Sequence, residues 1–462
     1  MSHDLRRYGI PSRVAPDRSL QMTANAIPAR QPGLRISWRK LEWWGAAISV
    51  FLTTGAVFPL LLMVQNDGLG EAERSKLQLL QLPIYLFTLT FLARHPGQLL
   101  LAMRRTLPML ALTALAVAST LWSIEPQITL RRAIGLLMGI LLSYLLAIRF
   151  TPRQLLAMVS LVVGLTLFLS LVLMVVKPSM AFMPDGTGLR GIFTHKNVLG
   201  WSACVGVILA LGLIADAGRL RTPPGLLMLG MSVGCLLLSA SATSIFAVVV
   251  GVVLFCFYGA LHRATGLSRA ILILMAVELA VVILLSLDMF LVPVLESLGK
   301  DATLTGRVPL WALIDMRISE RPWLGYGYQA FWAPGKPQAL WVAGILQWQP
   351  PHSHNGYRDI LLNFGVLGFA LFALAMFQTI RRGAALHCAA PRAGWLWMNV
   401  MVGVMLTLNL TESNLLTQND PWWLILMAII ASFALRTPAA VFRAEDGADT
   451  RAETKPRNQE RE

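Results

Sequence analysis

Long apolar runs constrain the fold of this chain more than any other feature of its sequence. A helix needs about 20 mostly apolar residues to cross a bilayer, and about twelve runs here approach that length. They begin near Trp43, Leu77, Leu107, Ala133, Gln154, Val198, Gly225, Thr243, Ala270, Asn355, Gly394 and Pro421. Because 56% of the 462 residues are hydrophobic and only 14% are charged, the chain is too apolar for a soluble domain of this size. We therefore expect an all-α polytopic membrane protein with about 12 transmembrane helices, within a range of about eleven to thirteen.

Arginine is distributed unevenly over the short loops, which predicts how the chain is oriented in the membrane. Short cytoplasmic loops are typically basic. Alternate loops here carry Arg94, Arg104, Arg105, Arg149, Arg153, Arg219, Arg221, Arg263, Arg269, Arg381, Arg382 and Arg392. This alternation predicts that both termini are cytoplasmic. The net charge of +15 is then explained by topology and by contact with anionic lipid, so a nucleic-acid partner is not expected.

The sequence divides into one membrane domain and two polar tails. Residues 1–40 are basic and residues 437–462 are highly charged, so both are predicted to be disordered cytoplasmic tails. Residues 41–436 form the predicted transmembrane domain, which includes an extracytoplasmic loop over residues 293–354. No signal-peptide pattern precedes the first apolar run, so we expect that run to be an uncleaved insertion signal.

The four cysteines lack C-x-x-C spacing, which disfavours a disulfide framework or a zinc site.

Polar residues that could carry chemistry gather in the loops predicted to face outward, the first being "GLRGIFTHKN" over residues 188–197. Arg190 lies between two glycine-containing turns, which let the backbone bend tightly while the guanidinium projects. His195, Lys196 and Asn197 follow as a basic cluster at the start of a helix, where free backbone amides and fixed positive charge favour a phosphate group. The alternative interpretation is that Arg190 and Lys196 only contact lipid headgroups.

The second outward segment is the long loop, where Arg307 follows a glycine and precedes a run with helical spacing. The apolar residues of that run are Leu310, Leu313, Ile314 and Ile318. A surface helix beginning near Arg307 is therefore predicted. The rest of the loop is rich in Trp and Tyr. These rings either form an interfacial aromatic belt or include a platform for the faces of sugars.

The third segment, "PHSHNGYRD" over residues 351–359, places two histidines one residue apart just before an apolar helix. Asn355 is the predicted N-cap of that helix. At the outer end of a span, His352 or His354 could act as a general base that takes a proton from a sugar hydroxyl. Two other interpretations stay open. The histidines could be a pair of metal ligands, for which no third ligand lies close in sequence, or part of a purely structural cap.

Two acids lie in or beside apolar runs. Glu412, in "LTESNLLTQND", either pairs with an arginine at the membrane interface or forms part of the site. Glu278 lies in the middle of another apolar run, where a carboxylate normally faces a partner in the bundle interior. Its role is open.

Four motifs, taken in order, resemble those of the O-antigen ligase and exopolysaccharide polymerase family, and most closely its ExoQ-like branch of Wzy-type polymerases. The motifs are "RGIFTHKNVLGW", "LTGRVPLW", "RPWLGYGYQAFW" and "HSHNGYRDILLNFGVLG". The resemblance covers roughly residues 40–435. It implies a metal-independent, inverting membrane glycosyltransferase with a C-type helical bundle and no cofactor, at the outer face of a bacterial inner membrane.

The resemblance also implies substrates, partners and roles for single residues. The substrates would be a polyprenyl-diphosphate-linked oligosaccharide and the growing polysaccharide chain, with membrane lipid and proteins of export or chain-length control as partners. Arg190 and Arg307 would hold the donor diphosphate, and His354 would be the base, although the extra histidine at 352 leaves that assignment open. The full set of candidate substrate-binding residues is Arg190, Arg307, Lys196, Asn197, Asn355 and Glu412.

Three alternatives remain beside a polymerase. An O-antigen ligase, which transfers lipid-linked glycan to a lipid A core, would need the same residues. A lipid-linked sugar flippase would place its polar groups at mid-membrane on broken helices, whereas here they cluster in outer loops. A non-catalytic scaffold or length regulator would tolerate the loss of both His352 and His354.

Overall fold

The computed structural model describes residues 37–57, 61–62, 79–216, 223–278 and 306–442. Regular structure in these ranges is helical, apart from an isolated bridge between Phe182 and Leu189. The predicted all-α fold is therefore confirmed. Most of both predicted tails and residues 293–305 of the predicted outer loop lie outside the described residues. All contacts reported below lie within the unit Glu42–Glu462.

Within the described residues, helices occur in each of the predicted apolar runs. Their bounds are α1 Trp38–Thr53, α4 Gln81–Leu92, α5 Pro96–Arg105, α6 Leu107–Ala118, η1 Ser119–Leu121, α7 Pro126–Arg149, α8 Pro152–Val176, α9 Pro178–Ala181, α10 Lys196–Asp216, α11 Pro223–Leu238, α12 Ala242–Leu261, α14 Arg307–Glu320, α15 Pro337–Leu346, α16 Gly356–Ala389, α17 Trp395–Leu408 and α18 Pro421–Leu435. A further helical segment covers residues 266–278, and at its end the side chain of Glu278 is exposed.

Helix length separates clear membrane spans from shorter apolar helices. In the described residues, α7, α8, α10, α12 and α16 are long and apolar enough to cross a membrane. The pair α5 and α6, bent by 93°, is a sixth candidate. In contrast, α11, α17 and α18 have 16, 14 and 15 residues. At about 1.5 Å per residue these helices are shorter than a hydrocarbon core of about 30 Å. The fold is thus that of a membrane protein with five or six clear spans in its described part.

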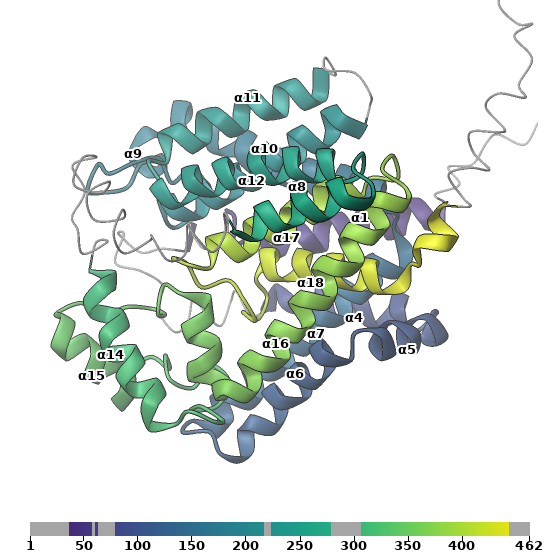
Figure 1. Ribbon diagram of the computed structural model, residues 1–462. Helices are drawn as coiled ribbons and strands as arrows, with labels where there is room; N and C mark the ends of the chain where they lie inside the picture. Colours follow the sequence, from purple (N-terminus) through teal and green to yellow (C-terminus); the bar gives the residue numbers. More distant parts are fainter. Residues whose placement is uncertain (1–36, 58–60, 63–78, 217–222, 279–305, 443–462) are drawn as a thin grey trace, which may run out of the picture. The chain divides into compact units, whose positions relative to one another are not determined.

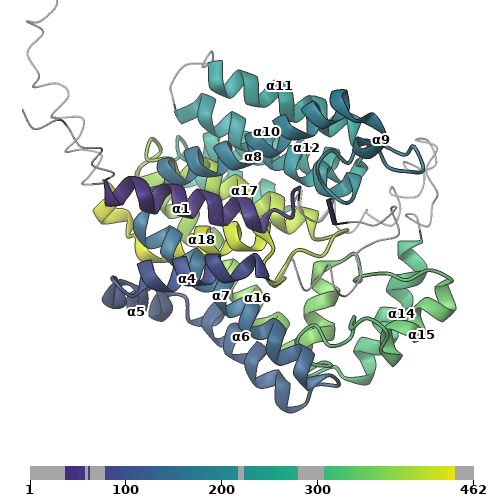
Figure 2. The ribbon, with the colours of Figure 1, turned by 180° about the vertical axis from the view of Figure 1, so that it is seen from behind.

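Two groups of helices pack side by side in the bundle (Figures 1 and 2). In the first group α10 contacts α8, α11 and α12, and in the second α7 contacts α4, α6 and α18. Helix α17 joins the groups because it packs on α12 as well as on α16 and α18. Helix α18 is buried almost throughout, with only its last residue outside the buried set. A short, fully apolar helix is stable here because other helices cover all its faces.

Basic residues from several loops bind neighbouring helix ends at one end of the bundle. Arg149, at the end of α7, donates to Glu42 from Nε and Nη2 over 2.5 and 2.7 Å. Arg153, near the start of α8, pairs over 2.7 Å with the aspartate that ends α10. Arg382 donates to the carbonyl oxygen of Arg105 over 2.8 Å. Loops that the charge alternation assigns to one side are therefore adjacent in space.

The described part of the long predicted loop is a folded subdomain. Helix α14 begins at Arg307, as predicted, and its Leu310 is fully buried. Leu310 packs with Tyr326 and Phe331 in a small apolar core separate from that of the bundle. Tyr326 and Phe331 are 2% and 0% exposed. Neither predicted role, belt or sugar platform, describes these two rings, because they form the interior of the subdomain.

Helix α16 begins where it was predicted but is broken at Gly365. This glycine has φ +61° and ψ −160°, a conformation that is essentially restricted to glycine. A Cβ at this position would collide with the backbone of Pro322 and Trp323. The next amide, of Val366, donates to the carbonyl oxygen of Pro322 over 2.7 Å. The break therefore joins the loop subdomain to a helix that is long and apolar enough to cross a membrane.

Candidate functional site

Residues from distant parts of the chain meet at the buried carboxylate of Glu412, in the segment between α17 and α18. The Glu412 side chain is only 1% exposed. Arg307 donates from Nη2 to Oε1 over 2.9 Å, and Asn197 donates from Nδ2 to the same oxygen over 3.3 Å. His354 lies against the other oxygen, with its Nδ1 3.6 Å from Oε2. We call Glu412, Arg307, Asn197 and His354 the Glu412 cluster; all were predicted site residues.

Helix starts explain how such distant segments reach one point. Helix α10 begins at Lys196, α14 at Arg307 and α16 at Gly356. Asn355 caps α16, as predicted, because its Oδ1 accepts from two free amides of the first turn over 3.1 and 3.0 Å. The Gly356 amide donates to the backbone carbonyl oxygen of Glu412 over 2.8 Å. The partial positive charge of helix N-termini favours the buried carboxylate and, beside it, an anionic ligand.

The two candidate bases have different surroundings. The backbone amide of His354 donates to Nδ1 of His352 over 3.1 Å, so a neutral His352 ring carries its proton on Nε2. His354 has a left-handed backbone with φ +52°, which is uncommon for a residue other than glycine. Its Nδ1 is buried, lies 3.6 Å from Oε2 of Glu412 and has no hydrogen-bond partner among the described residues, so the carboxylate acts on this ring through its charge. The arrangement favours His354 over His352 as a base.

The charge state of His352 follows from its burial. Burial lowers the pKa of His352 well below its usual range, and the nearby charges of His354 and Arg307 lower it further. The rings of the two histidines are only 4.2 Å apart, so a proton on one disfavours a proton on the other. His352 is therefore neutral at pH 7, where an ordinary histidine is already mostly neutral.

His195 belongs to this region, although it was not among the predicted site residues. Its Nδ1 accepts from the Asn197 amide over 3.2 Å at the start of α10. Burial lowers the pKa of His195, the Glu412 carboxylate raises it, and positive charge on Lys196 or His354 lowers it again. This coupling places His195 within electrostatic reach of the cluster. The sequence feature that points to His195 is its position directly before the helix that begins at Lys196 and includes Asn197.

Arg190 and Lys196 have described contacts that do not involve Glu412. Arg190 is 2% exposed, and its Nε donates to the carbonyl oxygen of Met180 over 3.1 Å. Burial lowers its pKa. Lys196 donates from Nζ to the carbonyl oxygen of Thr187 over 3.1 Å. A guanidinium that is buried in the protein does not fit the headgroup-contact interpretation of Arg190.

A cavity of about 460 Å³ lies beside His352. Its volume falls within the range of about 300–1,000 Å³ that is typical of small-molecule sites. Trp332, from the long loop, lines the cavity and donates from Nε1 to Asp359 over 2.9 Å. The sugar-platform interpretation therefore has structural support for this ring. We call this space the His352 cavity.

A metal site would need further ligands beside the two histidines. Within the described ranges, no group of three or more His, Cys, Asp or Glu side chains is arranged to hold a metal ion. The interpretation of His352 and His354 as a ligand pair thus has no third ligand in this part of the chain.

The fold and these contacts define a class: a polytopic membrane protein whose polar site is assembled from loops and helix starts at one end of an apolar bundle. Residues 226–373 match the family model of the O-antigen ligases. The chain is also 27% identical over 288 residues to the exopolysaccharide production protein ExoQ of Rhizobium meliloti (strain 1021). That alignment covers 58% of this chain and 62% of ExoQ, which is less than two thirds of the relative. The predicted resemblance to the O-antigen ligase and ExoQ-like family is confirmed.

The family match covers only part of the site. Arg307, His352, His354 and Asn355 lie within residues 226–373. Arg190, Asn197 and Glu412 lie outside that range. The fold brings Asn197 and Glu412 to the matched residues.

Proposed function

We propose that the protein is an exopolysaccharide polymerase that joins polyprenyl-diphosphate-linked oligosaccharide repeats at the outer face of a bacterial inner membrane. The observation that carries this proposal is the Glu412 cluster, in which one buried carboxylate holds Arg307 at 2.9 Å and lies 3.6 Å from His354. The similarity to O-antigen ligases and to ExoQ supports glycans as the substrate class. The reaction is an inverting glycosyl transfer that needs no metal and no cofactor.

In the proposed topology, residues 41–436 form a C-type bundle with about twelve spans, which include the five or six clear ones. The shorter helices α11, α17 and α18 then also cross, with their ends covered by neighbouring protein. The basic end of the bundle is cytoplasmic, together with the tails 1–40 and 437–462. The Glu412 cluster and the subdomain within residues 293–354 face outward. Lipid-linked substrate reaches the cluster from the outer leaflet.

The donor diphosphate binds at Arg307, with Arg190 as a second cation. Arg307 has one described hydrogen bond to Glu412 from Nη2, and a guanidinium has other N–H groups for phosphate oxygens. Lys196 and the amides at the start of α10 supply further positive potential. As the glycosidic bond breaks, negative charge grows on the diphosphate, and fixed guanidinium groups in a sheltered site stabilise it.

His354 acts as the general base for the acceptor. The acceptor hydroxyl attacks the anomeric carbon on the face opposite the diphosphate, and its proton passes to Nε2 of His354. The new carbon–oxygen bond forms as the electron pair of the old one leaves with the polyprenyl diphosphate. Glu412 stabilises the resulting imidazolium across the 3.6 Å separation at Nδ1. A positioned base of this kind contributes about 10²–10⁴-fold to rate.

An O-antigen ligase is the second candidate, because the matching family model carries that description. Transfer to a lipid A core needs the same leaving group and the same base. A flippase has less support, since its polar residues are expected on broken helices at mid-membrane. The polar residues here lie at helix starts and in loops at one end of the bundle.

The test uses purified full-length protein in proteoliposomes, supplied with lipid-linked single repeats from cells that lack this protein. A parallel reaction also contains lipid A core. We expect glycan polymer on polyprenyl diphosphate in both reactions, resolved by gel electrophoresis. If glycan became attached to the lipid A core instead, the protein would be a ligase and the polymerase proposal would be wrong. Movement of the lipid between leaflets with neither product would contradict an enzyme of either kind.

A further inference from the structure

The His352 cavity continues into a groove at the N-terminal ends of α4 and α7. This groove has a volume of about 870 Å³, and we call it the α7 groove. Arg132, Pro334 and Gln418 line both the cavity and the groove, so the two spaces are adjacent, and we call them together the path. The described lining of this path includes His352 but no member of the Glu412 cluster. The path therefore ends beside His352, whose ring lies 4.2 Å from that of His354.

The wall of the α7 groove is cationic. Its described lining contains Arg131, Arg132 and Lys336 and no acidic side chain. Lys336 pairs with Glu125 over 2.9 Å, and Arg132 donates from Nη1 to the carbonyl oxygen of Gln329 over 2.8 Å. Arg131 is exposed. An anionic group in the groove would therefore contact the exposed guanidinium of Arg131 and, within the wall, that of Arg132.

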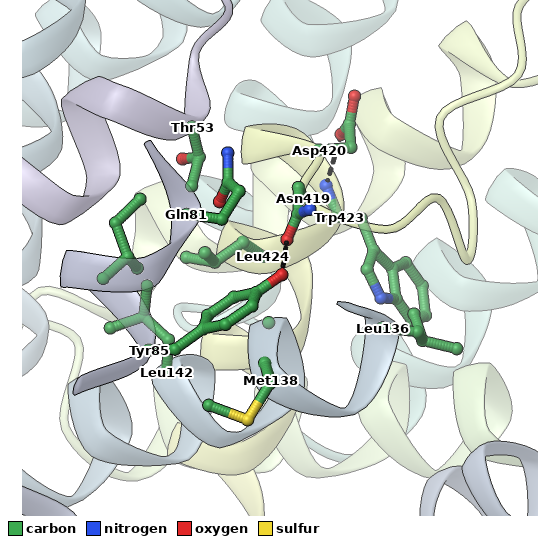
Figure 3. A pocket seen from close by; sticks show the side chains of 12 residues that line it. Thr53, Gln81, Tyr85, Leu136, Met138, Leu142, Asn419, Asp420, Trp423 and Leu424 are labelled. Atoms are coloured by element: carbon green, nitrogen blue, oxygen red, sulfur yellow. Dashed lines mark hydrogen bonds between the residues drawn. The ribbon is translucent and has the colours of Figure 1, made fainter. Parts of the chain in front are cut away.

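Two amide oxygens along the groove need hydrogen-bond donors. Oε1 of Gln81 and Oε1 of Gln418 are buried, and neither has a hydrogen-bond partner among the described residues. Buried polar atoms are normally paired, and sugar hydroxyls are suitable donors. Figure 3 shows Gln81 near Tyr85 and Asn419, which are joined by a hydrogen bond of 3.1 Å. That pair belongs to the wall where the groove meets the small space drawn there.

The outer flank of the groove is apolar. Leu130 and Ile134 of α7 line it and are 44% and 50% exposed. They are four residues apart and so share one face of the helix, next to Arg131. The cavity thus has amides and Trp332 beside His352, and the adjacent groove has both cations and an apolar face on α7. A free polysaccharide would leave the apolar face unused, and a simple phospholipid would leave the amide-lined cavity unused.

From these features we infer that the His352 cavity and the α7 groove together bind the acceptor as a glycan carried on a phosphorylated lipid. Its sugars occupy the cavity, its phosphate groups lie at Arg131 and Arg132, and its lipid follows the exposed face of α7. This inference rests on the proposed function, because it supplies the second substrate of the transfer. Two lipids have this chemistry: polyprenyl diphosphate for a polymerase and the phosphorylated lipid A core for a ligase.

The first experiment counts binding sites for farnesyl diphosphate, which has a lipid tail and a diphosphate but no sugar. The full-length protein is held in phosphatidylcholine nanodiscs and titrated with radiolabelled probe. We expect two sites in the wild type, one at Arg307 and one at Arg131. Arg131→Gln should weaken the second site at least about tenfold, since a hydrogen bond to a charged group contributes about 1.5–3 kcal/mol. Arg104→Gln, which changes an exposed arginine of α5, should leave both sites unchanged.

The outcomes separate this inference from the proposed function. A single site that is lost in Arg307→Lys and unchanged in Arg131→Gln would overturn the acceptor groove while leaving the donor site intact. A single site that is lost only in Arg131→Gln would support the groove and contradict the donor position. Displacement of the probe from the Arg131 site by phosphatidylglycerol would make the groove a general site for anionic lipid and overturn the inference.

A competition experiment identifies the source of the acceptor. Lipid-linked single repeats and lipid A core are each added against farnesyl diphosphate bound at the Arg131 site. Displacement by the lipid-linked repeats supports an acceptor on polyprenyl diphosphate, and displacement by the lipid A core supports a ligase acceptor. Gln418→Leu should weaken either glycolipid but not the sugar-free probe. Failure of both glycolipids to displace the probe would overturn the inference.

Discussion

At the scale of single residues, the site depends on one carboxylate that three side chains share. Glu412 is almost fully buried, and Arg307 is only 14% exposed. Removing one member of a buried ion pair costs about 3–5 kcal/mol, because the other is left without a partner. Glu412 therefore fixes Arg307 and His354 in one geometry and stabilises the folded site. In the proposed mechanism, this single side chain links binding of the donor to activation of the acceptor.

The first prediction concerns Glu412→Gln, which keeps the shape of the side chain but removes its charge. We expect turnover to fall by at least about 10²-fold, because His354 loses the group that stabilises its protonated form. Thermal stability should also fall, since Arg307 loses its counter-charge. The matched control is Glu320→Gln in α14, which removes the charge of a 45% exposed carboxylate that pairs with Arg317 outside the Glu412 cluster and should leave turnover nearly unchanged. Equal activity in both variants would contradict the role of Glu412.

The second prediction concerns pH and His352. Its pKa in the folded protein is lowered, while an unfolded histidine titrates near about 6.5. Below that pH the unfolded chain binds a proton that the folded chain does not, so acid favours unfolding. The contribution of His352 to stability is thus complete above about pH 6.5 and is lost as the pH falls below it.

His352→Gln removes this titration. We expect the unfolding temperature, followed by tryptophan fluorescence, to fall less between about pH 7 and pH 5 in this variant than in the wild type. His95→Gln, which changes a histidine just before α5 and outside the site, should retain the wild-type dependence. An identical acid response in His352→Gln and the wild type would refute the assignment.

At the scale of elements, the break in α16 joins this helix to the subdomain that begins with α14. Asn355 caps the first turn of α16 just after the two histidines, while the residues after Gly365 continue the helix. Tyr326 donates its amide to the carbonyl oxygen of Leu362 over 2.7 Å, next to the break. The subdomain is thus bound through its backbone to the helix that positions His354.

The third prediction is that Gly365→Ala displaces residues 321–325, because the new Cβ would occupy the space of the Trp323 backbone. The positive φ adds a cost of order 1–3 kcal/mol for a residue other than glycine. We expect faster proteolysis of the subdomain and reduced turnover. Gly344→Ala in α15 is the control, since a Cβ there meets no atom within 4 Å. Unchanged proteolysis of Gly365→Ala would contradict the anchoring role of the break.

Elements were easier to predict from the sequence than contacts between them. Long apolar runs located most of the helices, and the residue type of Asn355 was sufficient to predict its cap, because a cap uses neighbours within one turn. The break at Gly365 could not be predicted, since it depends on the approach of a distant backbone. For the same reason, the sequence left Glu412 open between an arginine partner and a site residue; in the structure it pairs with Arg307 and lies beside His354. Local signals specify elements, whereas the site depends on packing between them.

At the scale of the whole molecule, the proposal requires the basic end and the Glu412 cluster to face opposite sides of the membrane. The fourth prediction uses cysteines introduced at exposed Thr187 and Arg381. In intact spheroplasts, Thr187→Cys should react with an impermeant thiol reagent and Arg381→Cys should react only after lysis. Both are made in a variant without the four native cysteines. Labelling with the opposite pattern would reverse the proposed topology.

The measurement that tests the central claim most directly is the length distribution of lipid-linked glycans made by His354→Asn, with His352→Gln as the neighbouring control. Asparagine adopts the left-handed backbone of position 354 more readily than most residues, so the fold is preserved while the base is lost. We predict that His354→Asn accumulates single repeats on polyprenyl diphosphate and loses long polymer by about 10²–10⁴-fold, with farnesyl diphosphate still bound at Arg307. His352→Gln should retain polymer. Long polymer made by His354→Asn at the wild-type rate would contradict the account.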